Sequence, residues 1–275
     1  MLFSDIKKKL VNANIFGKLK KKKIKFISDH SEYVNSSTLL VINNKKFKRA
    51  YLKQAIDKGL DTIITNKYLN NVKITQIVVN NLNEEIVKLL NFRQPFRPKK
   101  SIAITGTNGK TSVTWYLAQI CKSNNIQTKL TGTLGFYKNN KKIKDSSLTT
   151  PSNLELYQFA NSNKKNYDIF ISEASSHGLH QGRYKNLKID IAAITNLSHD
   201  HLDYHKTFKS YVESKMLLFT KVLDENGTAV INSKLKNYKY FVSKIKSRNL
   251  KIIIFGSKDV YFTQKKFLKL HIFGK

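Results

Sequence analysis

A lysine and two hydroxyl residues follow a glycine-bearing turn near the middle of the chain. The turn holds Gly106 and Gly109, and Lys110, Thr111 and Ser112 come directly after it. Apolar residues before the turn predict a strand, and apolar residues at helical spacing after it predict a helix. The backbone N–H groups of such a turn and the N-terminus of the helix point at one place, which suits a phosphate. Lys110 can reach the terminal phosphates of a nucleotide, and the Thr111 hydroxyl can bind Mg²⁺.

The turn departs from the general nucleotide-binding pattern at one position. That pattern requires a glycine five residues before Gly109, where this chain has Ile104. The alternative interpretation is a plain strand-turn-helix unit whose lysine has no chemical role. We favour the phosphate site because strand, turn, lysine and hydroxyl occur in the order that phosphate binding requires.

A carboxylate ends a second expected strand. Residues 167–172 are mainly apolar, and Glu173 follows them, ahead of Ser175, Ser176 and His177. Ligands of open α/β sheets bind at the carboxyl ends of the strands, so we expect Glu173 to project toward the phosphates. One alternative is a glutamate that only faces water. Another is a serine–histidine hydrolase, but both serines lack the Gly-x-Ser-x-Gly turn of that class.

Three histidines and two aspartates lie within seven residues after a third expected strand, residues 189–194. Asn196 comes first, followed by His199, Asp200, His201, Asp203 and His205. This composition admits zinc. Beside a nucleotide loop, an oxygen-rich Mg²⁺ site with one imidazole fits better. We therefore assign His201 to the metal, and His199 and His205 to supporting or surface positions.

A lysine falls on the apolar face of the next expected helix. Thr207 is a suitable N-cap, and Phe208, Val212 and Phe219 share one face with Lys215. A lysine at such a position usually extends its ammonium to water along the apolar surface. The functional alternative is a lysine that turns toward the active site.

The spacing of apolar residues predicts an α/β protein in two parts. Strands over residues 39–42, 62–65 and 77–79, with a helix ending at Gly59, predict a small N-terminal α/β domain over residues 1–97. Pro95 and Pro98 indicate a linker. A mostly parallel, P-loop-type sheet domain follows over residues 98–275. Within it we expect a turn over residues 224–227, between a helix and a strand.

The net charge of +32 invites a nucleic-acid interpretation, which the composition does not favour. Only five of the basic residues are arginines, the residue that base and phosphate recognition prefers. We attribute the charge to lysines on solvated faces, although residues 18–25 are densely basic. A single cysteine, Cys121, excludes an internal disulfide, and no stretch suits a membrane span or a signal peptide. We expect a cytoplasmic protein.

Several segments together resemble the Mur ligase family, which builds the peptide of bacterial cell-wall precursors. The nucleotide turn has the form Thr-Gly-Thr-Asn-Gly-Lys-Thr over residues 105–111. The order and spacing of the others are similar to the UDP-N-acetylmuramoyl-tripeptide synthetase (MurE) type. These segments are residues 131–133, 149–151, 173–179, 181–183, 196–205 and 211–215.

The resemblance implies an ATP-dependent acid–amino-acid ligase of peptidoglycan synthesis, with Mg²⁺ and ATP as cofactors. It would add a diamino acid to UDP-MurNAc-L-Ala-D-Glu through an acyl phosphate. The resemblance implies an ATP site of Gly106, Thr107, Asn108, Gly109, Lys110, Thr111, Ser112 and Asn196. It gives catalytic roles to Lys110, Glu173, His201 and Lys215. The Mg²⁺ ligands would be Thr111, Glu173, His201 and Lys215 as a carbamate. The UDP-sugar peptide would contact Thr149, Thr150, Ser175, Gln181 and Arg183.

The sequence also departs from the family pattern. Residues 28–32 and 43–45 lack the family's Asp-Ser-Arg and Asp-Gly for the uridine end, and residues 233–235 lack the usual acidic residues. The family's third domain, which binds the amino acid, has no counterpart here. We expect a truncated ligase that works with a separately encoded third domain or is an inactive fragment. The remaining alternatives are another Mur-type or folylpolyglutamate-type ligase and a basic nucleic-acid-binding protein with an NTPase-like domain.

Overall fold

The computed structural model describes residues 2–256, except 11, 19–22, 44–47, 163, 166, 236–237, 247 and 249. The chain divides into two compact units, Met1–Pro95 and Phe96–Lys275. Parts of the basic stretch over 18–25 and of the segment 43–45 lie outside the described residues, as does the C-terminal stretch after 256. No helix in the described part of the chain has the length and apolar composition needed to cross a membrane.

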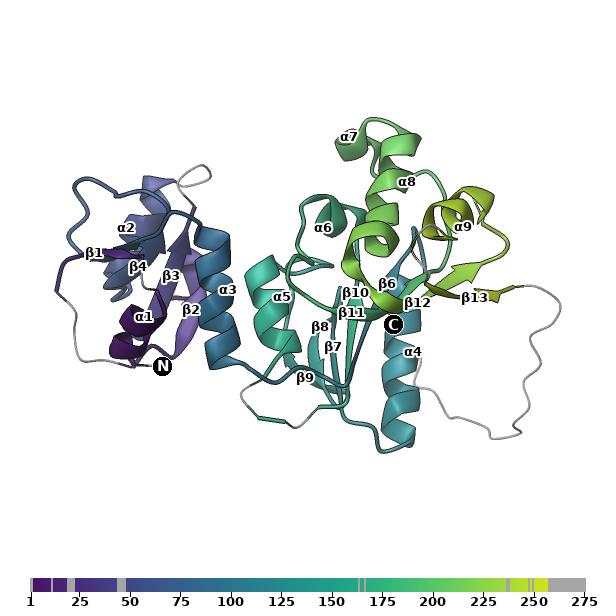
Figure 1. Cartoon of the computed structure of the whole chain (residues 1–275), viewed down its shortest axis with the longest axis horizontal. Coiled ribbons are helices and arrows are strands. Elements are labelled where there is room, and N and C mark those ends of the chain that lie inside the picture. The colour runs from purple at the N-terminus through teal and green to yellow at the C-terminus, as the bar shows by residue number, and fades with distance from the viewer. Residues whose placement is uncertain are drawn as a thin grey trace. The chain divides into compact units, whose positions relative to one another are not determined.

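The first unit is a five-stranded sheet with helices, as the alternating pattern predicts (Figure 1). The strand order is β1-β5-β4-β3-β2, and only the β1–β5 pair is antiparallel. The strands are β1 (Asn14–Phe16), β2 (Phe26–Ser28), β3 (Thr38–Ile42), β4 (Thr62–Thr65) and β5 (Thr75–Val78). The helices are α1 (Phe3–Lys9), η1 (Ser31–Tyr33), α2 (Arg49–Asp57) and α3 (Leu82–Arg93).

The second unit is built on an eight-stranded sheet. Its order is β13-β12-β11-β6-β10-β7-β8-β9, parallel except for the β7–β8 and β8–β9 pairs. The strands are β6 (Lys100–Thr105), β7 (Thr128–Gly132), β8 (Gly135–Lys138), β9 (Lys141–Lys144), β10 (Ile169–Glu173), β11 (Ile189–Ile194), β12 (Leu223–Asn232) and β13 (Lys251–Phe255). The helices are α4 (Lys110–Ser123), α5 (Asn153–Ala160), α6 (Ser176–His180), α7 (Leu202–His205), α8 (Phe208–Leu217), η3 (Leu218–Val222) and α9 (Tyr238–Lys246).

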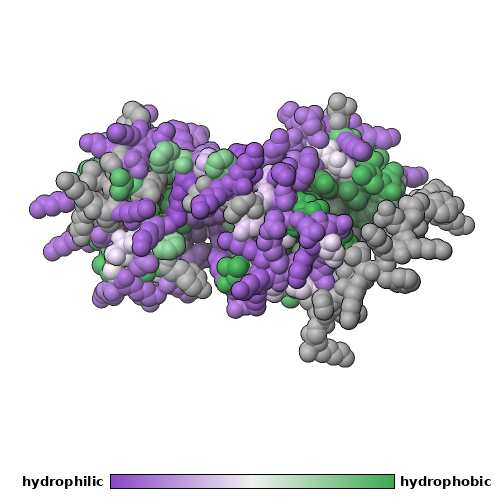
Figure 2. All heavy atoms as spheres, turned by 90° about the horizontal axis from the view of Figure 1, so that it is seen from below, coloured by the Kyte–Doolittle hydropathy of each residue, from purple (hydrophilic) through white to green (hydrophobic). Residues whose placement is uncertain are grey.

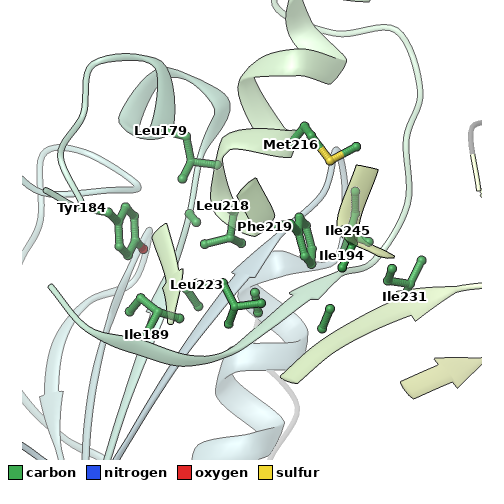
Figure 3. Packing of buried hydrophobic residues seen from close by; sticks show 14 of the residues in the cluster. Leu179, Tyr184, Ile189, Ile194, Met216, Leu218, Phe219, Leu223, Ile231 and Ile245 are labelled. Carbon is green, nitrogen blue, oxygen red and sulfur yellow. The ribbon is translucent and has the colours of Figure 1, made fainter. Parts of the chain in front are cut away.

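Alternating residues of the central strands bury their side chains in two different cores. On β10, Phe170 belongs to a large cluster with residues of α5, α6, α8, η3 and α9, whereas Ile171 packs with Ala118 of α4. Because neighbouring residues of a strand point to opposite faces, α4 covers one face and the other helices cover the opposite one. Figure 3 shows part of the larger cluster, in which Leu218 lies between Tyr184 and Phe219 in the view. The expected α/β class is therefore confirmed.

The strand order brings the three candidate segments to one edge. β6 lies between β10 and β11, and all three strands are parallel. The chain leaves β6 toward β7 on one side and later returns to β11 on the other side. The carboxyl ends of β6, β10 and β11 therefore meet at a topological switch point, where ligands of open α/β sheets bind.

One expected local feature is wrong. Residues 224–227 are not a separate turn between a helix and a strand, because β12 runs from Leu223 to Asn232. The pairing with β11 shifts register there, from Ile189 opposite Leu223 to Ile191 opposite Thr228. The four residues form an irregularity within the strand. Polar residues and a glycine occur both in such irregularities and in turns, so the sequence alone does not tell the two apart.

Candidate active site

Two glycines give the nucleotide turn its shape. Gly106 has a φ of +143°, and a Cβ built there would lie 1.9 Å from Thr195 Oγ1. Gly109, with a φ of +80°, is the N-cap of α4. Positive φ values are strained for residues with a side chain, so both positions require glycine. The turn thus presses its backbone against the end of β11 and points the N-terminus of α4 at the switch point.

The Lys110 ammonium lies over this turn. Its Nζ donates to the carbonyl oxygens of Gly106, at 2.9 Å, and Thr107, at 2.8 Å. Burial lowers the Lys110 pKa, and the charges of Glu173 and Asp200 act in the opposite direction. The ammonium therefore needs an anionic partner more than a surface lysine does, and a phosphate at the turn would supply one.

Asn196 fastens the turn from the β11 side. Its Oδ1 accepts from Asn108 N at 2.9 Å, and its Nδ2 donates to Asn108 O at 3.0 Å. Its backbone oxygen accepts from Thr107 N at 3.0 Å. The Thr107 hydroxyl lies 2.9 Å from the Tyr211 hydroxyl of α8. In this conformation, Asn196 holds the loop rather than pointing into an open site.

Glu173 is buried, with 2% of its surface exposed, beside Thr111. Its Oε2 accepts from the hydroxyls of Thr111, at 2.7 Å, and Thr133, at 3.2 Å, and its Oε1 accepts from Thr133 N at 2.9 Å. Burial raises the Glu173 pKa, and these hydrogen bonds and Lys110 oppose that shift. Hence Glu173 does not simply face water. A carboxylate and a hydroxyl in contact form the hard-oxygen donor set that Mg²⁺ prefers, so these residues fit the metal.

The Lys215 side chain does not reach solvent. Only 2% of the residue is exposed, and its Nζ donates to Gly106 O at 2.8 Å and lies 4.5 Å from the centre of the Tyr211 ring. Burial, followed by repulsion from Lys110, lowers the Lys215 pKa to about 7, against the attraction of Asp200. The alternative of a lysine extending to water is wrong, and Lys215 contacts the nucleotide turn directly.

The histidine-rich segment does not gather into one cluster of metal ligands. Among the described residues, no group of three or more His, Cys, Asp or Glu side chains has the geometry to hold a metal ion. His201 lies 3.4 Å from Asp200, between Nε2 and Oδ2, and its ring centre is 4.8 Å from that of His177. His199 instead stacks on Phe208. The zinc alternative therefore has no assembled site, and a role for His201 in Mg²⁺ binding stays a prediction.

Of the five residues expected to bind the sugar peptide, Thr149 and Thr150 precede α5, Ser175 is the N-cap of α6, and Gln181 and Arg183 follow α6. The Thr150 hydroxyl donates to Glu173 O at 2.7 Å and lies 3.0 Å from Ser175 Oγ. Thr149 Oγ1 lies 3.1 Å from Thr133 Oγ1, and Arg183 contacts both Thr150 O and Gln181. Thr150 is fully buried, so it positions Ser175 rather than offering its own side chain.

Comparisons with known proteins place this arrangement in a family. Residues 104–275 match the Mur ligase middle domain. The chain belongs to the Mur ligase family. It is 33% identical over 243 residues to the UDP-N-acetylmuramoyl-L-alanyl-D-glutamate–2,6-diaminopimelate ligase of Rickettsia bellii, covering 86% of this chain and 50% of the relative. It is 31% identical over 261 residues to UDP-N-acetylmuramyl-tripeptide synthetase 2 of Oceanobacillus iheyensis, covering 90% and 52%.

A solved structure of a Mur ligase has the same fold. This structure, of a UDP-N-acetylmuramoyl-L-alanyl-D-glutamate–2,6-diaminopimelate ligase, aligns with a TM-score of 0.65 at 26% identity. The alignment covers 92% of this chain and 52% of that one. The chain thus spans about half the length of the relatives it matches.

Sequence reasoning missed several residues that build the Mur ligase site. Thr133 gives Glu173 two hydrogen bonds, and the Tyr211 hydroxyl lies 2.9 Å from the Thr107 hydroxyl. Gly132 is needed because a Cβ there would lie 2.0 Å from Glu173 Oε1. Gly132, Thr133 and Tyr211 lie in segments that carry the family resemblance, residues 131–133 and 211–215, but no local pattern assigned them these contacts.

Proposed function

We propose that the chain is the nucleotide- and sugar-peptide-binding part of a Mur ligase that joins a diamino acid to UDP-MurNAc-L-Ala-D-Glu at the expense of ATP. The observation that carries the proposal is the group formed by Lys110, Thr111 and Glu173 at the switch point, with buried Lys215 on Gly106 O. The names of the relatives supply the substrates and make 2,6-diaminopimelate the first amino acid to test. We place the reaction in the cytoplasm, where ATP is available.

The proposed reaction has two balanced steps. A D-glutamate carboxylate oxygen attacks the γ-phosphorus of ATP, and ADP leaves. The amine of the diamino acid then attacks the acyl carbon, phosphate leaves, and a proton is released. Lys110 and the backbone N–H groups of residues 106–111 would stabilise the charge of the transferring phosphoryl group. Arg183, Gln181 and Ser175 would orient the sugar peptide.

The metal ligands proposed here are oxygen donors and one imidazole. Thr111 and Glu173 would hold one Mg²⁺, and His201 a second. Bound Mg²⁺ neutralises phosphate charge and lowers the barrier to phosphoryl transfer. The Lys215 amine would add CO2 with loss of one proton, giving a carbamate that offers anionic oxygens. Its burial and a pKa of about 7 support this step, because the neutral amine is the reactive form.

The first experiment measures ADP release by the purified chain with Mg·ATP, UDP-MurNAc-L-Ala-D-Glu and a panel of diamino acids, with products weighed by mass spectrometry. A product heavier by one diamino acid residue would support the ligase. ATP binding without product would assign the amino-acid step to a further domain. Neither ATP binding nor product would contradict the proposal. The K110A variant should abolish ADP release, and K122A, at an exposed position of α4, is the matched control.

The role of Lys215 has its own test. The K215A variant should lose turnover, and added formate or acetate should restore part of it by supplying an anionic oxygen near Gly106 O. Unchanged turnover in K215A would remove the lysine from the mechanism. Thermal denaturation of K215A shows whether a failure of rescue is due to unfolding of the variant. If K215A is unfolded, K215M replaces it, because methionine fills the buried position with an apolar side chain of similar length.

A further inference from the structure

The guanidinium of Arg183 is held entirely by neutral acceptors. Its Nε and Nη2 donate to Gln181 Oε1 at 3.0 and 2.6 Å, and its Nη1 donates to Thr150 O. Among the described residues no carboxylate forms an ion pair with it. Burial lowers its pKa, and the only opposing contribution comes from Tyr204. A partly buried guanidinium without a counterion favours an anionic ligand such as a carboxylate or phosphate.

The amide that holds Arg183 is itself fixed by a phenol. Gln181 Nε2 lies 3.3 Å from the Tyr204 hydroxyl, and that hydroxyl lies 3.0 Å from His180 Nδ1. Arginine can only donate, so the Gln181 oxygen must accept and its nitrogen must donate to Tyr204. The Tyr204 O–H is then free to donate to His180. One direction of hydrogen bonding therefore runs from Arg183 through Gln181 and Tyr204 to His180.

Three imidazole rings lie close to the Tyr204 ring. Its centre lies 4.1 Å from that of His177, 4.8 Å from that of His205 and 5.6 Å from that of His180. Tyr204 belongs to α7, three residues after His201, whereas Gln181 and Arg183 follow α6. In Figure 1 these two short helices lie on the same side of the second unit as α8. The hydroxyl thus connects the segment that carries His201 to the segment that carries the arginine.

We infer that Tyr204 is a positioning residue for the acidic substrate. Its hydroxyl orients the Gln181 amide, and that amide holds the Arg183 guanidinium toward an anionic group of the sugar peptide. The inference rests on the proposed function for the identity of the substrate. It assigns Tyr204 no contact with ATP, because the described contacts of its side chain are with Gln181 and with histidine rings.

The test compares Y204F with the unchanged chain. Phenylalanine keeps the ring and removes the hydroxyl, so Y204F should fold with a similar melting temperature. Loss of one neutral hydrogen bond corresponds to about a two- to tenfold effect on binding. We expect the Kd and KM for UDP-MurNAc-L-Ala-D-Glu to rise by that factor, while the KM for ATP stays unchanged. The matched control is Y240F, at an exposed position of α9.

A double-mutant cycle separates this relay from a general structural effect. If Tyr204 acts through Gln181, Y204F should add little to the effect of Q181A, whereas independent roles would give additive losses. If the chain has no turnover, calorimetry measures the Kd of UDP-MurNAc-L-Ala-D-Glu without ATP for the unchanged chain, the two single variants and the double variant. If the unchanged chain and Y204F bind the sugar peptide with equal affinity, the inference about Tyr204 is overturned and the proposed function is not. No binding by the unchanged chain would overturn the inference together with the proposed function.

Discussion

Two buried lysines show how one residue type takes different roles in this chain. Lys215 and Lys129 are 2% and 3% exposed. Lys215 contacts the nucleotide turn, whereas Lys129 donates to the carbonyls of Ala160 and Asn161 at the end of α5 and lies 4.4 Å from the Tyr167 ring centre. Neither role follows from sequence spacing, because a lysine on a strand or helix normally extends to water. The contact, not the residue type, distinguishes a site lysine from a helix cap.

Lys129 should make the free energy of unfolding depend on pH in the alkaline range. Burial, followed by repulsion from Lys138, lowers its pKa from 10.5 to about 8. Between these two values the unfolded chain binds more protons than the folded chain, so the contribution of Lys129 to stability rises with pH in that window. Relative to K129M, the free energy of unfolding should increase by about 2 kcal/mol between pH 7 and 10. Urea unfolding at both pH values measures this difference.

The control for this prediction is K141M, because Lys141 is exposed on β9. Its unfolding in urea is measured at the same two pH values. An equal pH dependence in K129M and the unchanged chain would mean that Lys129 titrates as an ordinary surface lysine, against its burial.

Glu173 predicts a conflict between stability and catalysis. Burial raises the pKa of Glu173 in the folded chain, so the folded chain binds more protons than the unfolded chain above pH 4.5. The contribution of Glu173 to the free energy of unfolding therefore falls as pH rises through that region. The E173Q variant removes this charge at similar volume. It should therefore be more stable than the unchanged chain at pH 7 without Mg²⁺, by an amount that shrinks toward pH 4.5, and should lose Mg·ATP turnover about a hundredfold or more.

Urea unfolding across pH 4.5–7.5 and steady-state ADP release measure the two effects. Retained turnover in E173Q would exclude Glu173 as a metal ligand. A variant less stable at every pH would instead show that the hydrogen bonds from Thr111 and Thr133 outweigh the desolvation of the carboxylate.

At the scale of elements, the connection between α7 and α8 is strained. Lys206 has a φ of +65° and a ψ of −39°, and the Thr207 N–H donates to His205 O at 2.8 Å. This is a γ-turn with positive φ, which is rare and strained for residues with a side chain. His201, at the other end of the same short segment, also has a positive φ, of +51°. Both ends of the segment that presents Tyr204 are therefore held in uncommon conformations.

Replacing Lys206 by glycine should relieve this strain. The relief exceeds the extra entropy that glycine gives the unfolded chain, so K206G should stabilise the protein by about 1 kcal/mol. The control K209G, at an exposed helical position of α8, should be destabilising instead. Urea unfolding of the two variants measures both changes. Destabilisation in K206G would indicate that the Lys206 side chain, through its contact with Asp203 O, contributes more than the strain costs.

Sequence patterns predicted the strands β6, β10 and β11 and the helices α4 and α8, because their apolar spacing and caps agree with their tertiary surroundings. Thr207 caps α8 as expected, through the N–H group of Ser210. The failures are local or tertiary. The pairing of β12 with β11 determines the conformation of residues 224–227. The positive φ at Lys206 was not predicted, because the residue there is not a glycine. The apolar residues Val113 and Ile120 correctly indicated α4 but are exposed on it.

The chemistry of the candidate site and its place at the carboxyl ends of the strands were predictable, but most of its contacts were not. Residues at strand ends, such as Glu173 and Asn196, could be placed at one edge because parallel strands end together. Their partners could not, because contacts such as Thr107 with Tyr211 or Gln181 with Tyr204 join segments that are 104 and 23 residues apart. Such pairs depend on how α6, α7 and α8 pack, which local spacing does not specify.

For the whole molecule, we attribute most of the net charge of +32 to lysines on the surface rather than to residues of the candidate site. Figure 2 shows hydrophilic residues over most of the face that it presents. The cations at the nucleotide turn, Lys110 and Lys215, are instead partly or fully buried. Surface charges are screened at physiological salt, and buried ones much less. We therefore expect Mg·ATP affinity to vary little with added salt once the ionic strength exceeds about 0.1 M.

The division into two units leads to a prediction about the second unit alone. All residues of the proposed ATP and metal sites, and both cores that flank the eight-stranded sheet, lie after Phe96. A fragment beginning at residue 96 should therefore fold cooperatively and bind Mg·ATP with a Kd within about threefold of the whole chain, because its contacts with the turn are internal. Calorimetry and thermal denaturation measure both properties. A fragment that unfolds or loses ATP affinity tenfold would show that the first unit stabilises the nucleotide turn, and K110A in the folded fragment would confirm that any binding uses the same lysine.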